Sequence, residues 1–91
     1  MKYEVKRTQF FRKDMKLMLK RGKDIEKLLA IVEKLAAGEA LPEASRDHIL
    51  TGNYSGFREC HIEPDWLLVY RRNESVLILT LMRTGTHSDL F

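Results

Sequence analysis

The amino-acid sequence predicts an α+β fold, with an N-terminal strand and an αα-hairpin packed on a small antiparallel sheet. Two observations predict it. Residues 9–38 carry apolar side chains at helical spacing, and residues 57–83 contain successive strand patterns separated by short polar turns. A chain of 91 residues has enough apolar side chains for one modest core, so we expect residues 1–91 to form a single domain.

The first half of the chain should contain a short strand and two helices. Tyr3–Lys6 alternates apolar and polar residues, as a strand does. Thr8 can cap a helix that runs over Gln9–Arg21, and Gly22 would end it. A second helix is expected over Asp24–Gly38, because its apolar residues repeat at i, i+3, i+4 and i+7. The tight turn between the two helices makes them an αα-hairpin.

The second half should form a loop and then a meander of strands. Residues 38–55 show no sustained periodicity, so we interpret them as a loop that carries Asp47 and His48. The last strand pattern is apolar on both of its faces, so we place it in the interior of the sheet, with the helices covering one face. The expected strands are Phe57–Ile62, Trp66–Arg72 and Val76–Arg83.

The composition excludes several classes of protein. Hydrophobic residues make up 44% and charged residues 32%, which is typical of globular chains and not of disordered ones. The longest apolar run, Val76–Met82, is too short to span a bilayer as a helix, so no membrane partner is expected. Cys60 is the only cysteine and no apolar leader opens the sequence, which favours a reducing, cytoplasmic location.

Positive charge is concentrated in the helical half. Residues 1–34 hold 11 Lys or Arg against 5 Asp or Glu, whereas residues 35–91 hold 5 against 8. Such a basic segment can attract RNA or an acidic protein partner, or it can be a solvated helix face. Lys16, Lys20 and Lys23 are the candidate contacts of this surface.

The most informative segment is the C-terminal one. Its last nine residues, 83–91, gather a guanidinium, an imidazole and an aromatic ring directly after an apolar strand pattern. The other two histidines of the chain, His48 and His61, lie in similar polar motifs, the second of them close to Asp65. Histidine titrates near about pH 6.5 and is the side chain best suited to acid–base catalysis at neutral pH. The pattern therefore indicates metal-free acid–base chemistry on a phosphodiester.

The order of elements and three motifs together resemble the RelE/ParE toxin superfamily of bacterial toxin–antitoxin modules, and its YafQ-like branch most of all. The motifs are Asp47-His48 with Leu50 and Gly52, Gly56-x-Arg58-x-x-His61-x-x-Pro64-Asp65-Trp66, and Arg83-Thr84-Gly85-Thr86-His87-Ser88-Asp89-Leu90-Phe91. The resemblance covers essentially the whole chain and implies a RelE-like fold. It also implies an endoribonuclease without a cofactor that cleaves mRNA in the ribosomal decoding site and is neutralised by a cognate antitoxin.

The resemblance implies a set of functional residues whose chemistry fits cleavage by the RNA 2′-hydroxyl. His87 is the candidate acid, and Asp65, assisted by His61 or His48, is the candidate base, with the choice among these three left open. Arg83 suits the charge that develops on the phosphate oxygens. Two rings could stack an RNA base, and Gly85 would let the backbone bend before His87. The rings are those of Trp66 and Phe91.

Other interpretations stay open at this point. A toxin similar to the ParE branch would inhibit DNA gyrase by protein contact and would need no imidazoles. A zinc site could form from His48, His61, Asp65 and His87, although no H-x-x-x-H or C-x-x-C spacing is present. The same side chains also have structural interpretations: Trp66 in the core, Arg83 paired with Asp89, and Phe91 as a hydrophobic anchor. Cys60 is expected to be structural, because no activating partner is apparent in the sequence.

Overall fold

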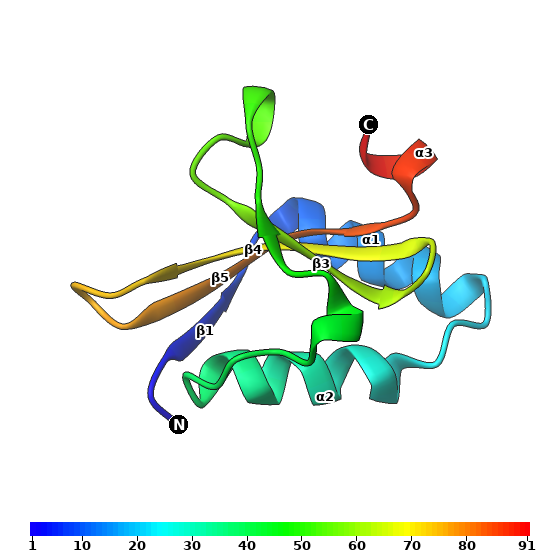
Figure 1. The fold of residues 1–91 in the computed structure, drawn as a ribbon. Helices are drawn as coiled ribbons and strands as arrows, with labels where there is room; N and C mark the ends of the chain where they lie inside the picture. The colour runs from blue at the N-terminus through cyan, green and yellow to red at the C-terminus, as the bar shows by residue number, and fades with distance from the viewer.

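Five strands form a mixed sheet with two long helices on one face (Figure 1). The computed structural model describes residues 1–91, and the strand order is β1-β5-β4-β3-β2. The elements are β1 Glu4–Arg7, α1 Gln9–Lys20, α2 Ile25–Ala36, the 3₁₀ turn η1 Glu43–Ser45, β2 His48–Ile49, the 3₁₀ turn η2 Gly52–Tyr54, β3 Arg58–Glu63, β4 Trp66–Asn73, β5 Ile78–Gly85 and α3 His87–Leu90.

The expected α+β class and the antiparallel meander of β3, β4 and β5 are confirmed. The sheet is mixed because the N-terminal strand pairs in parallel with β5, in the register Glu4↔Ile78 to Arg7↔Leu81. The first and last strands therefore lie side by side, although most of the chain separates them in the sequence.

Both helices begin where expected, and each is capped by a side chain. The Thr8 hydroxyl accepts a hydrogen bond from the Phe11 N–H at 3.0 Å, and the Asp24 carboxylate accepts one from the Glu26 N–H at 3.1 Å. The helical hairpin covers one face of the sheet and encloses the main core. That core contains Tyr3, Phe11, Met18, Leu28, Leu35, Ala36, Cys60, Trp66, Leu68, Tyr70, Leu79 and Leu81. None of the helices has the length and apolar character needed to cross a membrane.

The opposite face of the sheet carries a smaller apolar cluster. Leu67 and Val69 point away from the helices and pack with Leu90 of α3, while Tyr54 and Phe57 are half-buried against them. In Figure 1, α3 and the segment with η2 rise from this side of the sheet, opposite α2. The residues that surround this cluster are therefore held above the helix-free face.

Some sequence-based boundaries differ from the structure. Val76 and Leu77 are 61% and 41% exposed and belong to the turn before β5, because the left-handed backbone of Leu77 (φ 55°) cannot continue a strand. Strand β5 extends to Gly85, beyond the expected end at Arg83. The strand is nevertheless interior, between β1 and β4, as expected.

The segment 38–55 contains more structure than a loop. His48 pairs with Glu59 across the edge of the sheet, and two 3₁₀ turns flank this short strand. The tail also forms the helix α3 after Thr86, which periodicity could not predict over so few residues.

Candidate active site

The helix α3 is fixed by a network around Asp89. The Asp89 carboxylate accepts the Thr86 N–H at 2.8 Å, and the Thr86 hydroxyl accepts the Asp89 N–H, which completes a capping box. Arg21, at the end of α1, adds two hydrogen bonds to the same carboxylate at 2.7 and 3.0 Å. The Arg21 bonds first, then the Thr86 N–H, hold the pKa of Asp89 well below its usual range. The alternative interpretation that pairs Asp89 with Arg83 is wrong, because Asp89 pairs with Arg21.

Gly85 serves this network in a way that the sequence did not indicate. A Cβ added at Gly85 would lie 2.9 Å from both Cβ and Oδ2 of Asp89. The absence of a side chain at Gly85 therefore lets Asp89 of the capping turn approach the strand closely. The sharp bend expected at Gly85 is not observed, because β5 continues regularly to this residue.

His87, at the start of α3, is held by Asp65 from the β3–β4 turn. The Asp65 Oδ1 atom accepts the His87 backbone N–H at 3.2 Å and faces the ring Nδ1 at 3.1 Å. These contacts, the backbone one first, lower the pKa of Asp65. Because the carboxylate is an acceptor, Nδ1 donates and Nε2 is the ring nitrogen left to a substrate.

His61 provides a second imidazole beside the first. It lies on β3, and its ring centroid is 6.0 Å from that of His87. Its Nδ1 lies 3.1 Å from the Pro64 carbonyl oxygen, which can only accept, so Nδ1 carries the proton and Nε2 keeps its lone pair in the neutral ring. The structure thus brings His61, Asp65 and His87 together, as expected.

His48 is held separately at the edge of the sheet. Its Nδ1 lies 2.7 Å from the Arg46 carbonyl oxygen and its Nε2 lies 3.4 Å from the Glu59 carboxylate. Glu59 is only 4% exposed, and sequence reasoning missed it. Both ring nitrogens of His48 face acceptor oxygens of the protein, which leaves neither free to take a proton from a substrate hydroxyl.

Arg83 is held at the opposite side of the same face. Its Nε and Nη2 donate to the Asp14 carboxylate at 2.7 and 3.0 Å, and its Nη1 donates to the Tyr54 hydroxyl at 3.4 Å. The side chain is 22% exposed. The hydrogen bonds to Asp14, first of all, raise the pKa of Arg83.

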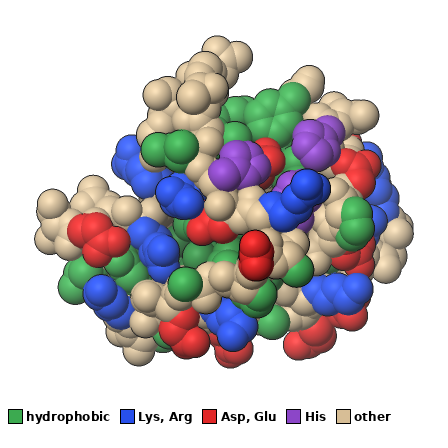
Figure 2. Space-filling model, viewed as in Figure 1, with side chains coloured by type: hydrophobic (Ala, Val, Ile, Leu, Met, Phe, Trp, Pro, Cys, Tyr) green, Lys and Arg blue, Asp and Glu red, His purple; other side chains and the backbone are tan.

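The strand register places these groups in one row across the sheet. Val69 in β4 pairs with Arg83 on one side and with Glu59 on the other, and Glu59 pairs with His48. Arg83 and His48 are thus three strand spacings apart, or about 14 Å between backbones. Figure 2 shows the histidines gathered on the upper part of one face of the molecule.

Two aromatic rings border the site. Phe91 is 62% exposed, meets Tyr54 edge-on with centroids 5.5 Å apart, and lies 6.3 Å from the His87 ring. Its exposure leaves a ring face open on which a base could stack. Tyr54 was not among the predicted site residues, although it is the only aromatic residue in segment 38–55.

Trp66 was expected to stack an RNA base, but its ring is buried and no base can reach it. The ring is 0% exposed, and the indole N–H donates at 2.9 Å to the Thr84 hydroxyl, which donates in turn to the Leu67 carbonyl. Trp66 packs against the helices, on the face of the sheet opposite the histidines, so its structural interpretation holds. Cys60 is likewise buried, and burial raises the pKa of its thiol to about 12.

Comparison with known proteins identifies the family. Residues 3–91 match the family described as "Bacterial toxin of type II toxin-antitoxin system, YafQ". The protein belongs to this family.

Individual relatives are similar to this chain over nearly its whole length. The mRNA interferase toxin YafQ of Escherichia coli K12 is 42% identical over 82 residues, which covers 89% of this chain and 87% of the relative. The crystal structure of the E. coli DinJ-YafQ toxin–antitoxin complex matches with a TM-score of 0.89 and 37% identity, covering 100% and 99% of the two chains. The crystal structure of a metal-bound toxin from Helicobacter pylori matches with a TM-score of 0.91 and 39% identity, covering 98% and 99%.

The metal bound by the H. pylori toxin bears on the zinc hypothesis for this YafQ-family chain. No group of three or more His, Cys, Asp or Glu side chains here is arranged to hold a metal ion. His48 faces Glu59, whereas Asp65 faces His87. Three of the four residues of the hypothetical zinc site are thus engaged in two separate contacts, and His61 faces the Pro64 carbonyl oxygen.

The basic residues of the helical hairpin differ in availability. Lys16 and Lys20 are exposed on α1 and make no ion pair. Lys23 lies 3.4 Å from the Glu63 carboxylate, which Lys27 also contacts at 2.9 Å, and its amino group is 5.9 Å from the Trp66 ring centroid. Lys23 therefore already contacts other residues of the protein, whereas the amino groups of Lys16 and Lys20 are free to bind a partner.

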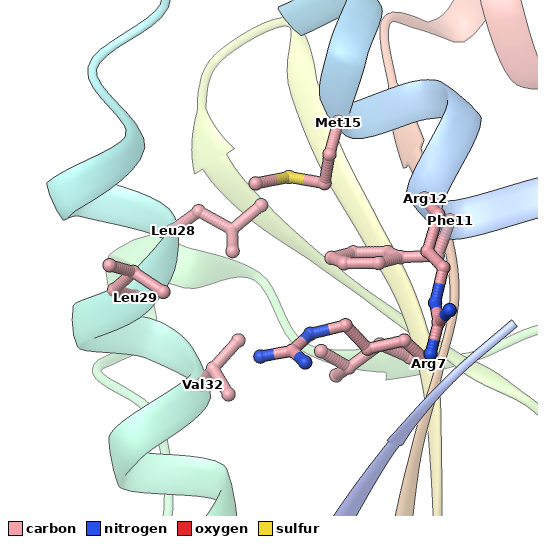
Figure 3. A pocket seen from close by; sticks show the side chains of 8 residues that line it. Arg7, Phe11, Arg12, Met15, Leu28, Leu29 and Val32 are labelled. Atoms are coloured by element: carbon pink, nitrogen blue, oxygen red, sulfur yellow. The ribbon is translucent and has the colours of Figure 1, made fainter. Parts of the chain in front are cut away.

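A groove opens between the two long helices, away from the histidines. Its volume is about 290 Å³, and Figure 3 shows the side chains of Phe11, Met15 and Leu28 directed into the space between α1 and α2. Six of the eight lining residues are hydrophobic, and the other two are Arg7 and Arg12. This combination suits an amphipathic segment that carries acidic side chains.

Proposed function

We propose that this protein is the toxin of a type II toxin–antitoxin system, a ribosome-dependent endoribonuclease that cleaves mRNA in the decoding site. The observation that carries the proposal is the pair of imidazoles on the helix-free face. His87 is oriented by Asp65, and His61 lies 6.0 Å from it between ring centroids. Catalytic hydrogen bonds span about 2.6–3.2 Å, so two rings at this separation can reach opposite sides of one phosphate group.

The roles follow from the free atoms of each ring. The Nε2 atom of His61 removes the 2′ proton, the 2′-oxygen forms a bond to phosphorus, and the bond from phosphorus to the 5′ oxygen breaks. The Nε2 atom of protonated His87 gives its proton to the departing oxygen. The products are a 2′,3′-cyclic phosphate and a 5′-hydroxyl.

This assignment selects among the bases that the sequence left open. Asp65 is the poorer base because its pKa is lowered and its oxygen already accepts from His87, so we assign it the orientation of that ring. His48 has both nitrogens engaged, so we assign it contact with the RNA at the β2 edge. Arg83 stabilises charge on the non-bridging oxygens, and Phe91 stacks a base.

The partners follow from surface charge and from the relatives. Ribosomal RNA is the expected polyanion for Lys16 and Lys20. A cognate antitoxin is expected because the related YafQ forms a complex with DinJ. The groove between α1 and α2, with two arginines, suits an acidic antitoxin segment that folds on binding. We place the protein in the cytoplasm, where ribosomes translate mRNA.

Cell-free translation of a defined mRNA, followed by primer extension, tests this function. The wild-type protein should stop translation and produce cuts at discrete positions, and His87→Ala should lower cleavage about 10²-fold or more. Ser88→Ala is the matched control, since it changes the neighbouring exposed residue of α3. Inhibition without cuts, or trapped gyrase on DNA, would contradict the proposal and favour a gyrase inhibitor.

A further inference from the structure

Asp14 is the acidic residue in closest contact with the proposed phosphate-binding arginine. It lies in the middle of α1, 69 positions before Arg83 in the sequence, and its side chain is only 12% exposed. Its two carboxylate oxygens accept from Nε and Nη2 of Arg83 at 2.7 and 3.0 Å. This side-on, two-bond contact fixes the plane of the guanidinium as well as its position.

The contact is part of the way that α1 covers the edge of β5. Strand β1 pairs with β5 only as far as Leu81, so the remainder of β5 has no strand partner on that side. The Thr8 hydroxyl donates to the Met82 carbonyl at 2.7 Å, and Asp14 Oδ2 accepts the Thr84 N–H at 3.1 Å. Asp14 thereby holds the backbone that carries Arg83 together with the Arg83 side chain.

The guanidinium keeps free donors after these contacts are counted. Arginine has five N–H donors, of which Asp14 takes two and the Tyr54 hydroxyl takes one. Two donors remain, one on each terminal nitrogen. Since Tyr54 belongs to the apolar cluster of the helix-free face and touches Phe91, the free donors lie at the border of the catalytic face.

We propose that Asp14 is a positioning residue for cleavage, which acts by holding Arg83 in the orientation that presents these two donors to the phosphate. The proposal rests on the proposed function, because it presupposes that Arg83 takes part in RNA cleavage. It makes α1 a part of the catalytic site and not only a cover of the core.

The test is a double-mutant cycle with kinetics. Asp14→Asn keeps an oxygen for the Thr84 N–H but removes the charged two-bond contact with Arg83. We expect it to lower kcat about 10- to 10²-fold with little change in KM, because misplacement by about 1 Å can cost that much. In an Arg83→Ala background the same change should cause no further loss.

A spectroscopic readout separates positioning from stability. The Arg83 Nε–H should be protected from exchange in nuclear magnetic resonance spectra of the wild-type protein, and Asp14→Asn should remove this protection while thermal stability stays close to wild type. Asp24→Asn is the matched control, because it makes the same chemical change on the same helical hairpin at a cap that contacts no arginine. It should leave both kcat and the Nε–H signal unchanged.

The outcomes that overturn the two proposals are different. If Arg83→Ala cleaves like the wild type, the role of Arg83 in the proposed function is wrong. If Arg83→Ala is impaired but Asp14→Asn keeps full kcat, or adds its own loss in the Arg83→Ala background, then Asp14 does not act through Arg83 and the positioning role is wrong.

Discussion

Gly85→Ala should disable the toxin by disturbing one hydrogen-bond network. The new methyl group would lie 2.9 Å from Asp89 Cβ, an atom next to the backbone that cannot turn aside by rotation of the side chain. Asp89 Oδ2 would be equally close, and that oxygen accepts from both Thr86 and Arg21. The helix α3 must therefore shift or undock.

The magnitude follows from the contacts that are lost. A helix cap contributes about 1 kcal/mol, and a half-exposed ion pair up to about 1 kcal/mol. Loss of both is about 2 kcal/mol, a factor of roughly 30 in the docking equilibrium of α3. Because α3 carries His87, we expect cleavage to fall 10-fold or more, while the core strands keep their stability.

The assay compares two glycine substitutions. Gly22 has a φ of 74° and no atom within 4 Å of an added Cβ, so Gly22→Ala introduces backbone strain of about 1 kcal/mol without a clash against α3. Cleavage in cell-free translation and hydrogen exchange of residues 86–91 are measured for both variants. Gly85→Ala should lose cleavage and protection of the tail, and Gly22→Ala should keep both. Full cleavage by Gly85→Ala would refute the coupling of the capping network to His87.

Three further predictions concern the core, the basic surface and the stability of the fold at low pH. Trp66→Phe should lower the free energy of unfolding by about 2 kcal/mol in urea titrations, yet leave kcat of the folded protein unchanged; lost cleavage at full stability would make Trp66 a substrate contact. Lys16→Glu combined with Lys20→Glu should weaken ribosome binding and flatten its salt dependence without a change in thermal stability, whereas unchanged binding would make these lysines a solvated face. Arg21 lowers the pKa of Asp89, so this pair stabilises the fold above about pH 4, and the stabilisation is lost as pH falls through the lowered pKa. The difference in thermal stability between wild type and Asp89→Asn should therefore be largest near neutral pH and shrink towards pH 2, and a constant difference would contradict this.

Local patterns in the sequence predicted the elements that depend on local physics. The caps at Thr8 and Asp24, the apolar stripe of α2 and the meander of strands all follow from neighbouring residues. The parallel pairing of β1 with β5 joins opposite ends of the chain, and no short-range pattern contains that information. Leu77 failed as a strand residue because its turn geometry overrides its apolar character.

The sequence predicted the main residues of the candidate site but not the residues that hold them in place. The motifs contain His61, Asp65 and His87, and the structure brings these three together. Trp66 was placed at the site because it belongs to the family motif that contains His61 and Asp65, but its position in β4 turns its ring towards the helices. Asp14 could not be found from the motifs, because only tertiary packing brings α1 to Arg83.

The chemistry of the cut RNA ends tests the central claim most directly. Transfer of a proton from the 2′-hydroxyl and attack on phosphorus must leave a 2′,3′-cyclic phosphate, or the 3′-phosphate formed from it, together with a 5′-hydroxyl. We predict these ends from the wild-type protein on programmed ribosomes, also when a chelator removes transition metals while magnesium keeps the ribosomes intact. Free 3′-hydroxyl and 5′-phosphate ends, or cleavage that stops with the chelator and returns with zinc, would contradict the two-histidine mechanism.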